Sequence, residues 1–160
     1  MRVGLTGHQD IGSESDTDWV RRTLEHEARR PELTEGAMSL ARGADQLYAT
    51  LLQRVGKPFM VVLPCVHYEK TFTEKDDVER YRALIEQARQ IVRLDFIEPS
   101  EEAFWAAGQR VVELSEYLLA VWNGLPAKGL GGTADVVEYA IARGIRVMHI
   151  DPLKRQTSIL

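Results

Sequence analysis

The sequence predicts an α/β fold: a single doubly wound, mostly parallel sheet with helices on both faces. Short apolar segments alternate with helical patterns over residues 1–153, and residues 154–160 form a loose polar tail. The run 58–64 is continuously apolar, as expected for a parallel strand that is covered on both faces. No linker, repeat or low-complexity segment divides the chain. We therefore expect one Rossmann-like domain.

Strands and helices are expected to alternate from end to end, so that successive strands are joined by right-handed crossovers. The expected strands cover residues 2–7, 36–41, 58–64, 90–97, 117–123 and 145–150. The expected helices cover residues 15–30, 44–55, 78–88, 104–112 and 133–143.

Local signals place the boundaries in the first half of the chain. Gly7 closes the first apolar run, and Ser15 is the expected N-cap of the first helix, which ends before Pro31. Apolar residues from Ala44 to Val55 recur at intervals of three and four, which predicts a helix that Gly56 stops. Prolines bound the third strand, which suits a buried parallel strand.

The second half repeats the same signals. Apolar residues between Val78 and Ala88 mark a third helix, and those between Phe104 and Val112 mark a fourth. The fifth helix follows a cluster of glycines and ends near Gly144. The apolar run 145–150 is the last expected strand.

The charge of the chain argues against one class of partner. Its formal net charge is −4, whereas nucleic-acid-binding proteins usually carry a basic balance or a basic stripe. The basic pairs Arg21–Arg22 and Arg29–Arg30 fall on a helix that also carries Glu25 and Glu27. A nucleic-acid partner is therefore not expected.

The cysteine content and the hydropathy suggest a cytoplasmic protein. Cys65 is the only cysteine, so no intrachain disulfide and no cysteine-based metal motif is available. Neither a signal peptide nor an apolar run of membrane-spanning length is present, so no membrane partner is expected. We also expect no metal, because no Cys/His metal spacing occurs, and no cofactor, because neither a dinucleotide fingerprint nor a P-loop occurs.

Unusual residues follow the expected strands, in the segments "TGHQD", "SLARGADQ", "LPCVHYE" and "WNGLPAKGLGGTAD". Ligands of doubly wound folds bind at the carboxyl ends of the strands, near the point where the strand order reverses. The candidate ligand-binding residues are Gly7, His8, Gln9, Ser39, Arg42, Gly43, Asp45, Trp122, Asn123, Gly131, Gly132 and Thr133. We expect His67 and Tyr68 to be an exposed pair in the third of these loops.

Two of these loops are suited to phosphate. The glycines before Thr133 leave backbone N–H groups uncovered at a helix start, where free donors and the helix dipole favour anions. Arg42 has a planar fork that binds two oxygens of a phosphate or carboxylate. The alternatives are a plain turn with Thr133 as N-cap, and an ion pair between Arg42 and Asp45.

Taken in order, "VGLTGH", "SLARGAD" and "GGTADVVEYA" resemble the SLOG superfamily, which includes the LOG enzymes and the DprA/Smf DNA-processing proteins. "SLARGAD" is similar to the DprA segment "SGxARGxD", with Ser39 and Arg42 to Asp45 matching and Leu40 departing. "GGTAD" is similar to the end of the LOG motif "PGGxGTxxE", whose glutamate falls on Val136.

The resemblance implies a nucleotide or nucleotide-derived ligand, such as AMP or ADP-ribose, with its phosphate on Gly131–Thr133. Asp45 or Asp135 would then accept hydrogen bonds from ribose hydroxyls. The alternative is a LOG-like hydrolase that cleaves the N-glycosidic bond of nucleoside 5′-monophosphates. Its catalytic residues would be Asp135, Arg42 and Glu138, because a carboxylate can stabilise the sugar cation or activate water. The resemblance also implies a homo-oligomer.

Overall fold

The computed structural model describes residues 1–160. The strands are β1 (Arg2–Gly7), β2 (Glu35–Met38), β3 (Phe59–Cys65), β4 (Gln90–Phe96), β5 (Tyr117–Val121), β6 (Arg146–Asp151) and β7 (Gln156–Ile159). The helices are α1 (Glu14–Ala28), α2 (Ala44–Arg54), the short 3-10 helix η1 (Tyr68–Thr71), α3 (Lys75–Gln87), α4 (Glu101–Glu113) and α5 (Thr133–Ala142).

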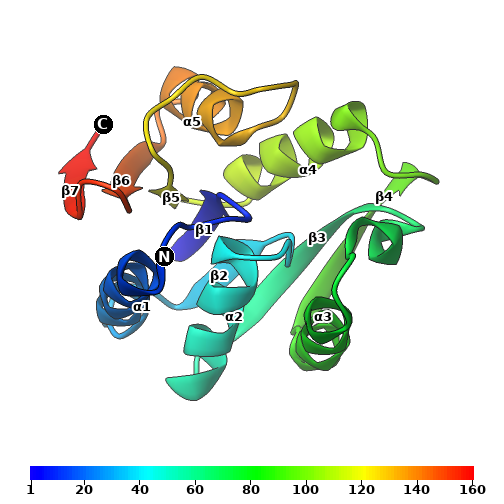
Figure 1. Cartoon of the computed structure of the whole chain (residues 1–160), viewed down its shortest axis with the longest axis horizontal. Helices are drawn as coiled ribbons and strands as arrows, with labels where there is room; N and C mark the ends of the chain where they lie inside the picture. The colour runs from blue at the N-terminus through cyan, green and yellow to red at the C-terminus, as the bar shows by residue number, and fades with distance from the viewer.

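The strands form one seven-stranded sheet in the order β4-β3-β2-β1-β5-β6-β7. All neighbouring pairs are parallel except β6 and β7. The chain builds outward from β1 in one direction as far as β4, and then returns to the other side of β1 with β5 (Figure 1). The expected α/β fold class is confirmed, and the strand order reverses between β1 and β5.

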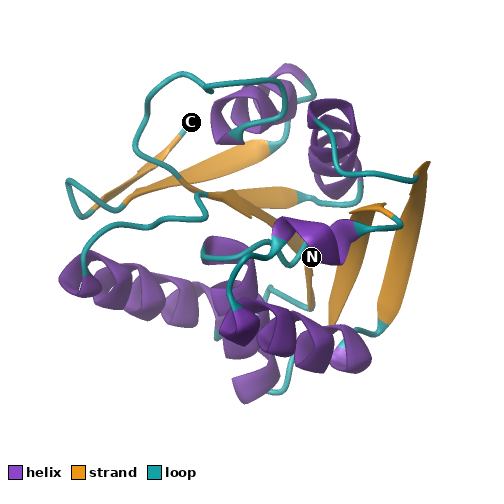
Figure 2. Ribbon diagram, turned by 45° about the vertical axis from the view of Figure 1, so that its right-hand side comes forward, coloured by secondary structure: helices purple, strands orange, loops and turns teal.

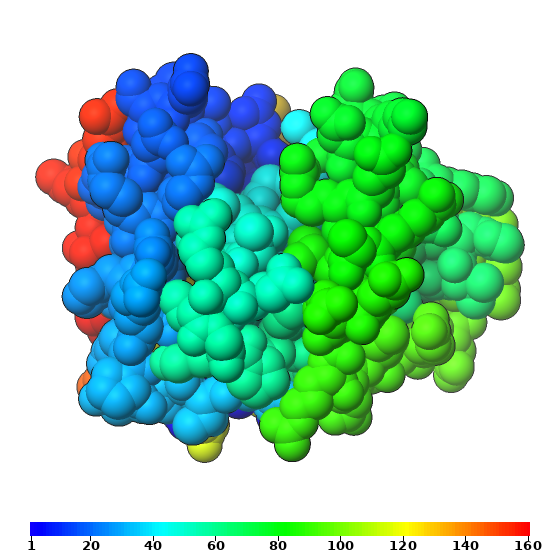
Figure 3. Space-filling model, turned by 90° about the horizontal axis from the view of Figure 1, so that it is seen from below, coloured from blue at the N-terminus to red at the C-terminus, as the bar shows by residue number.

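Helices cover both faces of this sheet (Figures 1 and 2). Helices α1, α2 and α3 lie side by side on one face, with α2 in the middle (Figure 3), and α4 and α5 pack together on the other. Two separate hydrophobic clusters of 26 and 12 buried residues fill the two layers. The central strand β5 is buried along its whole length, as a parallel strand between two helical layers should be.

Helix α1 begins two residues earlier than expected. Its N-cap is Ser13, whose side chain accepts a hydrogen bond from the Asp16 backbone N–H at 3.1 Å. The Asp16 carboxylate in turn accepts from the Ser13 N–H at 3.4 Å, which completes a capping box. Ser15, the expected N-cap, instead lies exposed in the first turn of the helix.

The C-terminal residues also differ from the expectation of a loose tail. Residues Gln156–Ile159 form β7, which pairs antiparallel with β6 at the edge of the sheet. The Arg155 guanidinium donates to the Asp16 carboxylate at 3.1 Å, which links this hairpin to the start of α1. A polar segment of this kind gives little strand signal, because all four residues of β7 are exposed.

None of the helices has both the length and the apolar character that a membrane span requires.

The capping box predicts different effects for two serines of the same segment. Ser13→Ala should lower the free energy of unfolding by about 1 kcal/mol, because the N–H of Asp16 loses its acceptor. Ser15→Ala should leave it within about 0.5 kcal/mol of the wild type, because Ser15 is an exposed helical residue. Urea denaturation of the two variants compares them directly, and equal losses would contradict the assigned cap.

Candidate functional site

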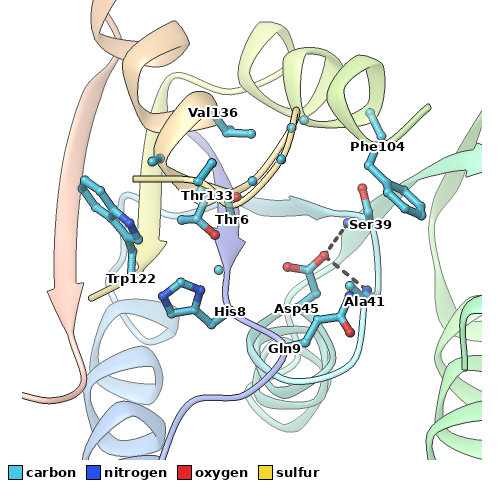
Figure 4. Close-up of a pocket in the computed structure, with 18 of the residues that line it drawn as sticks. Thr6, His8, Gln9, Ser39, Ala41, Asp45, Phe104, Trp122, Thr133 and Val136 are labelled. Carbon is cyan, nitrogen blue, oxygen red and sulfur yellow. Dashed lines mark hydrogen bonds between the residues drawn. The ribbon is translucent and has the colours of Figure 1, made fainter. Parts of the chain in front are cut away.

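One cavity occupies the carboxyl edge of the sheet. Its volume is about 660 Å³, which lies within the range of about 300–1,000 Å³ typical of small-molecule sites. The cavity lies at the ends of β1 and β5, where the strand order reverses, and the loops after β1, β2 and β5 all contribute to its walls (Figure 4). Pro64 and Tyr68, from the segment after β3, line it too, so the structure brings together all four segments that the sequence singled out.

The loop after β1 forms the centre of the cavity wall. Gly7, His8 and Gln9 all line it. Gly7 packs so tightly that a Cβ there would lie 2.7 Å from the Cβ of Ala44. The His8 Nε2 atom accepts a hydrogen bond from the backbone N–H of Asn123 at 3.2 Å. In the neutral ring the proton is therefore on Nδ1, which leaves His8 a donor for a ligand.

The loop after β2 turns through a strained residue. Leu40 has a φ of 58°, a left-handed conformation that favours glycine and is rare for a large side chain. The Asp45 Oδ2 atom holds this turn by accepting from the N–H groups of Ser39 at 3.0 Å and of Ala41 at 3.3 Å (Figure 4). These two hydrogen bonds stabilise the turn that places Leu40 at positive φ.

Asp45 is a buried carboxylate, with 7% of its surface exposed. Burial raises its pKa from the ordinary 3.8 to about 7, and the two backbone hydrogen bonds offset only part of this effect. No lysine, arginine or histidine forms an ion pair with it. The alternative that Arg42 pairs with Asp45 is therefore wrong, because Arg42 lies 3.9 Å from Asp77 instead.

Arg42 faces the cavity with its charge largely available. Its side chain is 45% exposed, and its only ion pair is the long contact with Asp77. Arg42 lines the cavity. Its guanidinium is thus placed to reach an anionic group of a ligand without first breaking a short ion pair.

Gly43 does not line the cavity, although the sequence made it a candidate. Its φ is 88°, and a Cβ there would lie 2.6 Å from the carbonyl oxygen of His8 and still closer to that of Gln9. The N–H of Ala44 donates to the same His8 oxygen at 3.2 Å. Gly43 therefore serves to let the β1 loop approach the start of α2.

The glycine-rich loop presents free backbone donors to the cavity. Gly132 is the N-cap of α5 and, having no side chain, leaves the first N–H groups of the helix without a capping bond. The N–H groups of Gly132, Thr133 and Ala134 make no hydrogen bond within the protein, and all three residues line the cavity. The alternative in which Thr133 is itself the N-cap is wrong, because Thr133 is already helical.

The loop itself depends on Asp135. The Asp135 carboxylate accepts from the N–H of Gly131 at 2.9 Å, which removes that donor from the expected phosphate site. Neither Asp135 nor Glu138 lines the cavity, and Glu138 is exposed on the outer surface of α5. The structure thus separates these two carboxylates, the expected catalytic pair of a hydrolase, from the space in which a ligand would bind.

Trp122 and Asn123 line the cavity but already have partners. The Trp122 indole N–H donates to the Leu125 carbonyl at 2.8 Å, and its ring lies 5.0 Å from that of His149. The Asn123 side-chain oxygen accepts from the Leu125 N–H at 3.1 Å. Both residues fix the start of the glycine-rich loop, and Trp122 also offers an apolar surface.

Several lining residues were not among the candidates from the sequence, and Tyr68, Lys128 and Phe104 are three of them. Tyr68 was expected to be exposed, but it is 4% exposed because its ring packs against Phe72 and Tyr81. Lys128 and Phe104 also line the cavity. Lys128 directly precedes the glycines and could have been found from that position, whereas Phe104 and Tyr68 reach the cavity only through helix packing.

The charges of the lining are mixed. Arg42 and Lys128 are its cations, and the carboxylates of Asp10, Asp45 and Glu101 also line it. No group of three or more histidine, cysteine, aspartate or glutamate side chains is arranged to hold a metal ion. The site is therefore suited to a ligand that carries both an anionic group and hydrogen-bond donors.

Known structures share this fold. DNA processing protein A (DprA) from Streptococcus pneumoniae superposes with a TM-score of 0.66 at 18% identity over 92% of this chain. DprA from Helicobacter pylori superposes with a TM-score of 0.68 at 12% identity, over 96% of this chain and 70% of its own length. The molybdenum cofactor binding protein from Rippkaea orientalis superposes with a TM-score of 0.58 at 13% identity, over 94% of this chain and 76% of its own length. The chain has an SLOG-type fold.

This likeness establishes the SLOG-type fold and no particular ligand. The chain spans about half of the Streptococcus pneumoniae DprA, 49% of its length. No protein-family model and no curated protein sequence matches the chain.

The expectation that excluded a nucleic-acid partner is contradicted. The Helicobacter pylori DprA, whose structure describes a single-stranded DNA binding mode, has the same SLOG-type fold. The error lies in using the net charge of −4, which is a property of the whole chain. Phosphates are bound locally, by groups such as arginine and the free N–H groups of a helix start.

Two glycines test the close approach within the SLOG-type fold. Gly43→Ala and Gly56→Ala both place a side chain at positive φ, at 88° and 74°, which costs at least about 1 kcal/mol in each variant. Gly43→Ala should lower the free energy of unfolding by about 1–3 kcal/mol more than Gly56→Ala does. A Cβ at position 43 meets the backbone of His8 and Gln9, whereas a Cβ at position 56 meets no atom within 4 Å. Chemical denaturation measures both, and equal losses would contradict the packing role of Gly43.

The buried carboxylate predicts a pH-dependent stability. Because the pKa of Asp45 is about 7 in the folded protein against an ordinary 3.8, its ionisation opposes folding. The penalty is absent below pH 3.8, grows as the pH rises, and is complete above about pH 7. Each unit of difference between the two pKa values corresponds to about 1.4 kcal/mol of unfolding free energy. Asp45→Asn avoids the penalty, so the variant should gain stability relative to the wild type as pH rises.

Urea denaturation at pH 5 and pH 8 measures this gain. The wild type and Asp45→Asn are compared at each pH, so that other titrating groups cancel. A difference in unfolding free energy that stays the same at both pH values would show that Asp45 ionises normally.

Proposed function

We propose that the cavity binds a nucleotide or a nucleotide-derived ligand, such as AMP or ADP-ribose, with its phosphate on the residues Gly132–Ala134. The observation that carries this proposal is the uncapped start of α5. Its free N–H groups lie at the reversal of strand order, which is where doubly wound folds bind their ligands.

The cations of the cavity support a phosphate at this position. Arg42 and Lys128 line the same space as the free N–H groups of Thr133 and Ala134. Backbone donors, the helix dipole and the cationic side chains each favour an anion. Arg42 would provide two parallel hydrogen bonds, and the Thr133 hydroxyl, which has no hydrogen bond within the protein, would provide another.

The rest of the ligand would extend toward the mixed walls of the cavity. Phe104, Leu125 and Leu130 line the cavity and are 36%, 61% and 45% exposed. Exposed apolar side chains around a polar pocket suit the flat face of a base. Trp122 adds an aromatic surface at the end of β5.

We do not propose hydrolysis of an N-glycosidic bond. Asp135 and Glu138 would supply its carboxylate, and both lie outside the cavity lining. Asp135 is already bound to the N–H of Gly131. Binding, in contrast, needs only the donors that line the cavity.

Single-stranded nucleic acid is the second candidate ligand. The likeness to the Helicobacter pylori DprA supports it, because the structure of that protein describes single-stranded DNA binding. The backbone phosphates of an oligonucleotide are diesters with one negative charge each, and the same N–H groups and cations would serve them as well as the monoester of a mononucleotide. The two differ in salt dependence, because binding several phosphates releases several counterions.

Binding of AMP tests the main proposal. AMP at about 100 times its dissociation constant should stabilise the protein by roughly 2.7 kcal/mol, which thermal unfolding detects. Arg42→Ala should weaken AMP binding about tenfold, because a charge-assisted hydrogen bond is lost. Titration calorimetry gives the affinities, and a single-stranded oligonucleotide titrated at two salt concentrations tests the second candidate.

Arg80→Ala is the matched control. Arg80 pairs with Asp77 at 3.3 Å, as Arg42 does at 3.9 Å, but Arg80 does not line the cavity. It should therefore leave the affinity for AMP unchanged. If neither AMP, ADP-ribose nor the oligonucleotide binds, or if Arg42→Ala changes nothing, the proposal is wrong.

A further inference from the structure

The Asp45 carboxylate has one oxygen that the fold does not use. Its Oδ2 atom accepts two backbone hydrogen bonds, from Ser39 and Ala41. Its Oδ1 atom makes no hydrogen bond within the protein and points away from that turn, toward the space that His8 and Thr133 also face (Figure 4). Only 7% of the Asp45 surface is exposed, so this oxygen is aimed into the cavity from a buried position.

The fold does not require a carboxylate at this position. An asparagine could accept the same two N–H groups with its amide oxygen, and it would hold the turn at Leu40 without a buried charge. Burying a carboxylate without a cationic partner is unfavourable. The second oxygen of Asp45 therefore needs an explanation other than the turn.

Two hydroxyl groups accompany this oxygen. Ser39 and Tyr68 line the same cavity, and neither hydroxyl makes a hydrogen bond within the protein. Burial and then the charge of Asp45 raise the pKa of the Tyr68 hydroxyl well above its usual value. The hydroxyl therefore keeps its proton at neutral pH and can donate a hydrogen bond. An acceptor and two hydroxyl donors thus line the same cavity.

This combination matches the chemistry of a sugar hydroxyl. A hydroxyl donates one hydrogen bond and accepts others, so it can donate to a carboxylate while it accepts from a neighbouring hydroxyl. A phosphate would be repelled by Asp45, whereas the uncapped start of α5 attracts it. The two walls of the cavity therefore favour different parts of one ligand.

We propose that Asp45 is the specificity-determining residue of the site, and that its Oδ1 atom accepts a hydrogen bond from a ribose hydroxyl of the ligand. Ser39 and Tyr68 donate to the same sugar. The cavity therefore prefers ribonucleotides over their deoxy forms. This inference rests on the proposed binding of a nucleotide phosphate at Gly132–Ala134, and it assigns the ribose to Asp45 in place of Asp135.

Deoxy analogues of AMP test the inference. The affinities of AMP, 2′-deoxy-AMP, 3′-deoxy-AMP and 2′,3′-dideoxy-AMP are measured by titration calorimetry. The wild type should bind AMP about 10 to 100 times more tightly than the dideoxy form, because a hydrogen bond to a charged group is lost. The two monodeoxy forms identify which hydroxyl Asp45 accepts from.

Asp45→Asn is the decisive variant. It keeps an acceptor for Ser39 and Ala41, but it places an amide N–H₂ where the free carboxylate oxygen was. The preference for AMP over the dideoxy form should fall to within about threefold. Asp77→Asn is the matched control, because Asp77 is also buried, at 8% exposure, and does not line the cavity. Its preference should equal that of the wild type.

Tyr68→Phe provides a second test that keeps the ring packed against Phe72 and Tyr81. It removes only the hydroxyl, so it should lower the preference for AMP severalfold even if Asp45→Asn does not fold. Equal binding of AMP and the dideoxy form by the wild type would overturn the inference. If Arg42→Ala still weakened the binding of both ligands, the proposed function would stand and only the inference about Asp45 would fail. If no phosphorylated ligand bound to the wild type, both would fail.

Discussion

The close approach of the β1 loop to the start of α2 is the contact on which the whole carboxyl edge depends. Gly43 permits it, because any Cβ at this position would meet the carbonyl oxygens of His8 and Gln9. The hydrogen bond from the N–H of Ala44 to His8 then fixes the two segments together. Arg42 and Asp45, on either side of this contact, are placed in the cavity as a consequence.

Different parts of the cavity favour ligand groups of different charge. The uncapped start of α5 offers N–H groups without an acid among them, because Asp135 is turned back to the N–H of Gly131. On the wall formed by the β2 loop, Asp45 presents an oxygen without a cation. The start of α5 and Arg42 thus favour negative groups, whereas the Asp45 oxygen favours a hydrogen-bond donor, and a phosphorylated sugar carries both.

Much of the fold could be predicted from the sequence, because it depends on local patterns. Continuous apolar runs and helical periodicity placed every parallel strand and every long helix. The errors have local causes. Ser13 and Ser15 are equally good caps by residue type, and only backbone geometry distinguishes them. The polar β7 forms because β6 offers a free edge for pairing, which no property of residues 156–159 reveals.

The order of residues is enough to predict an α/β fold with candidate residues at the carboxyl ends of its strands, because parallel strands end on one edge of the sheet. The contacts that each of these residues makes depend on the folded chain. The directions of the Asp45 and Asp135 carboxylates are set by backbone N–H groups that become available only once their loops have formed. Tyr68 enters the cavity because its ring packs against Phe72 and Tyr81, and such contacts between distant elements leave no local pattern in the sequence.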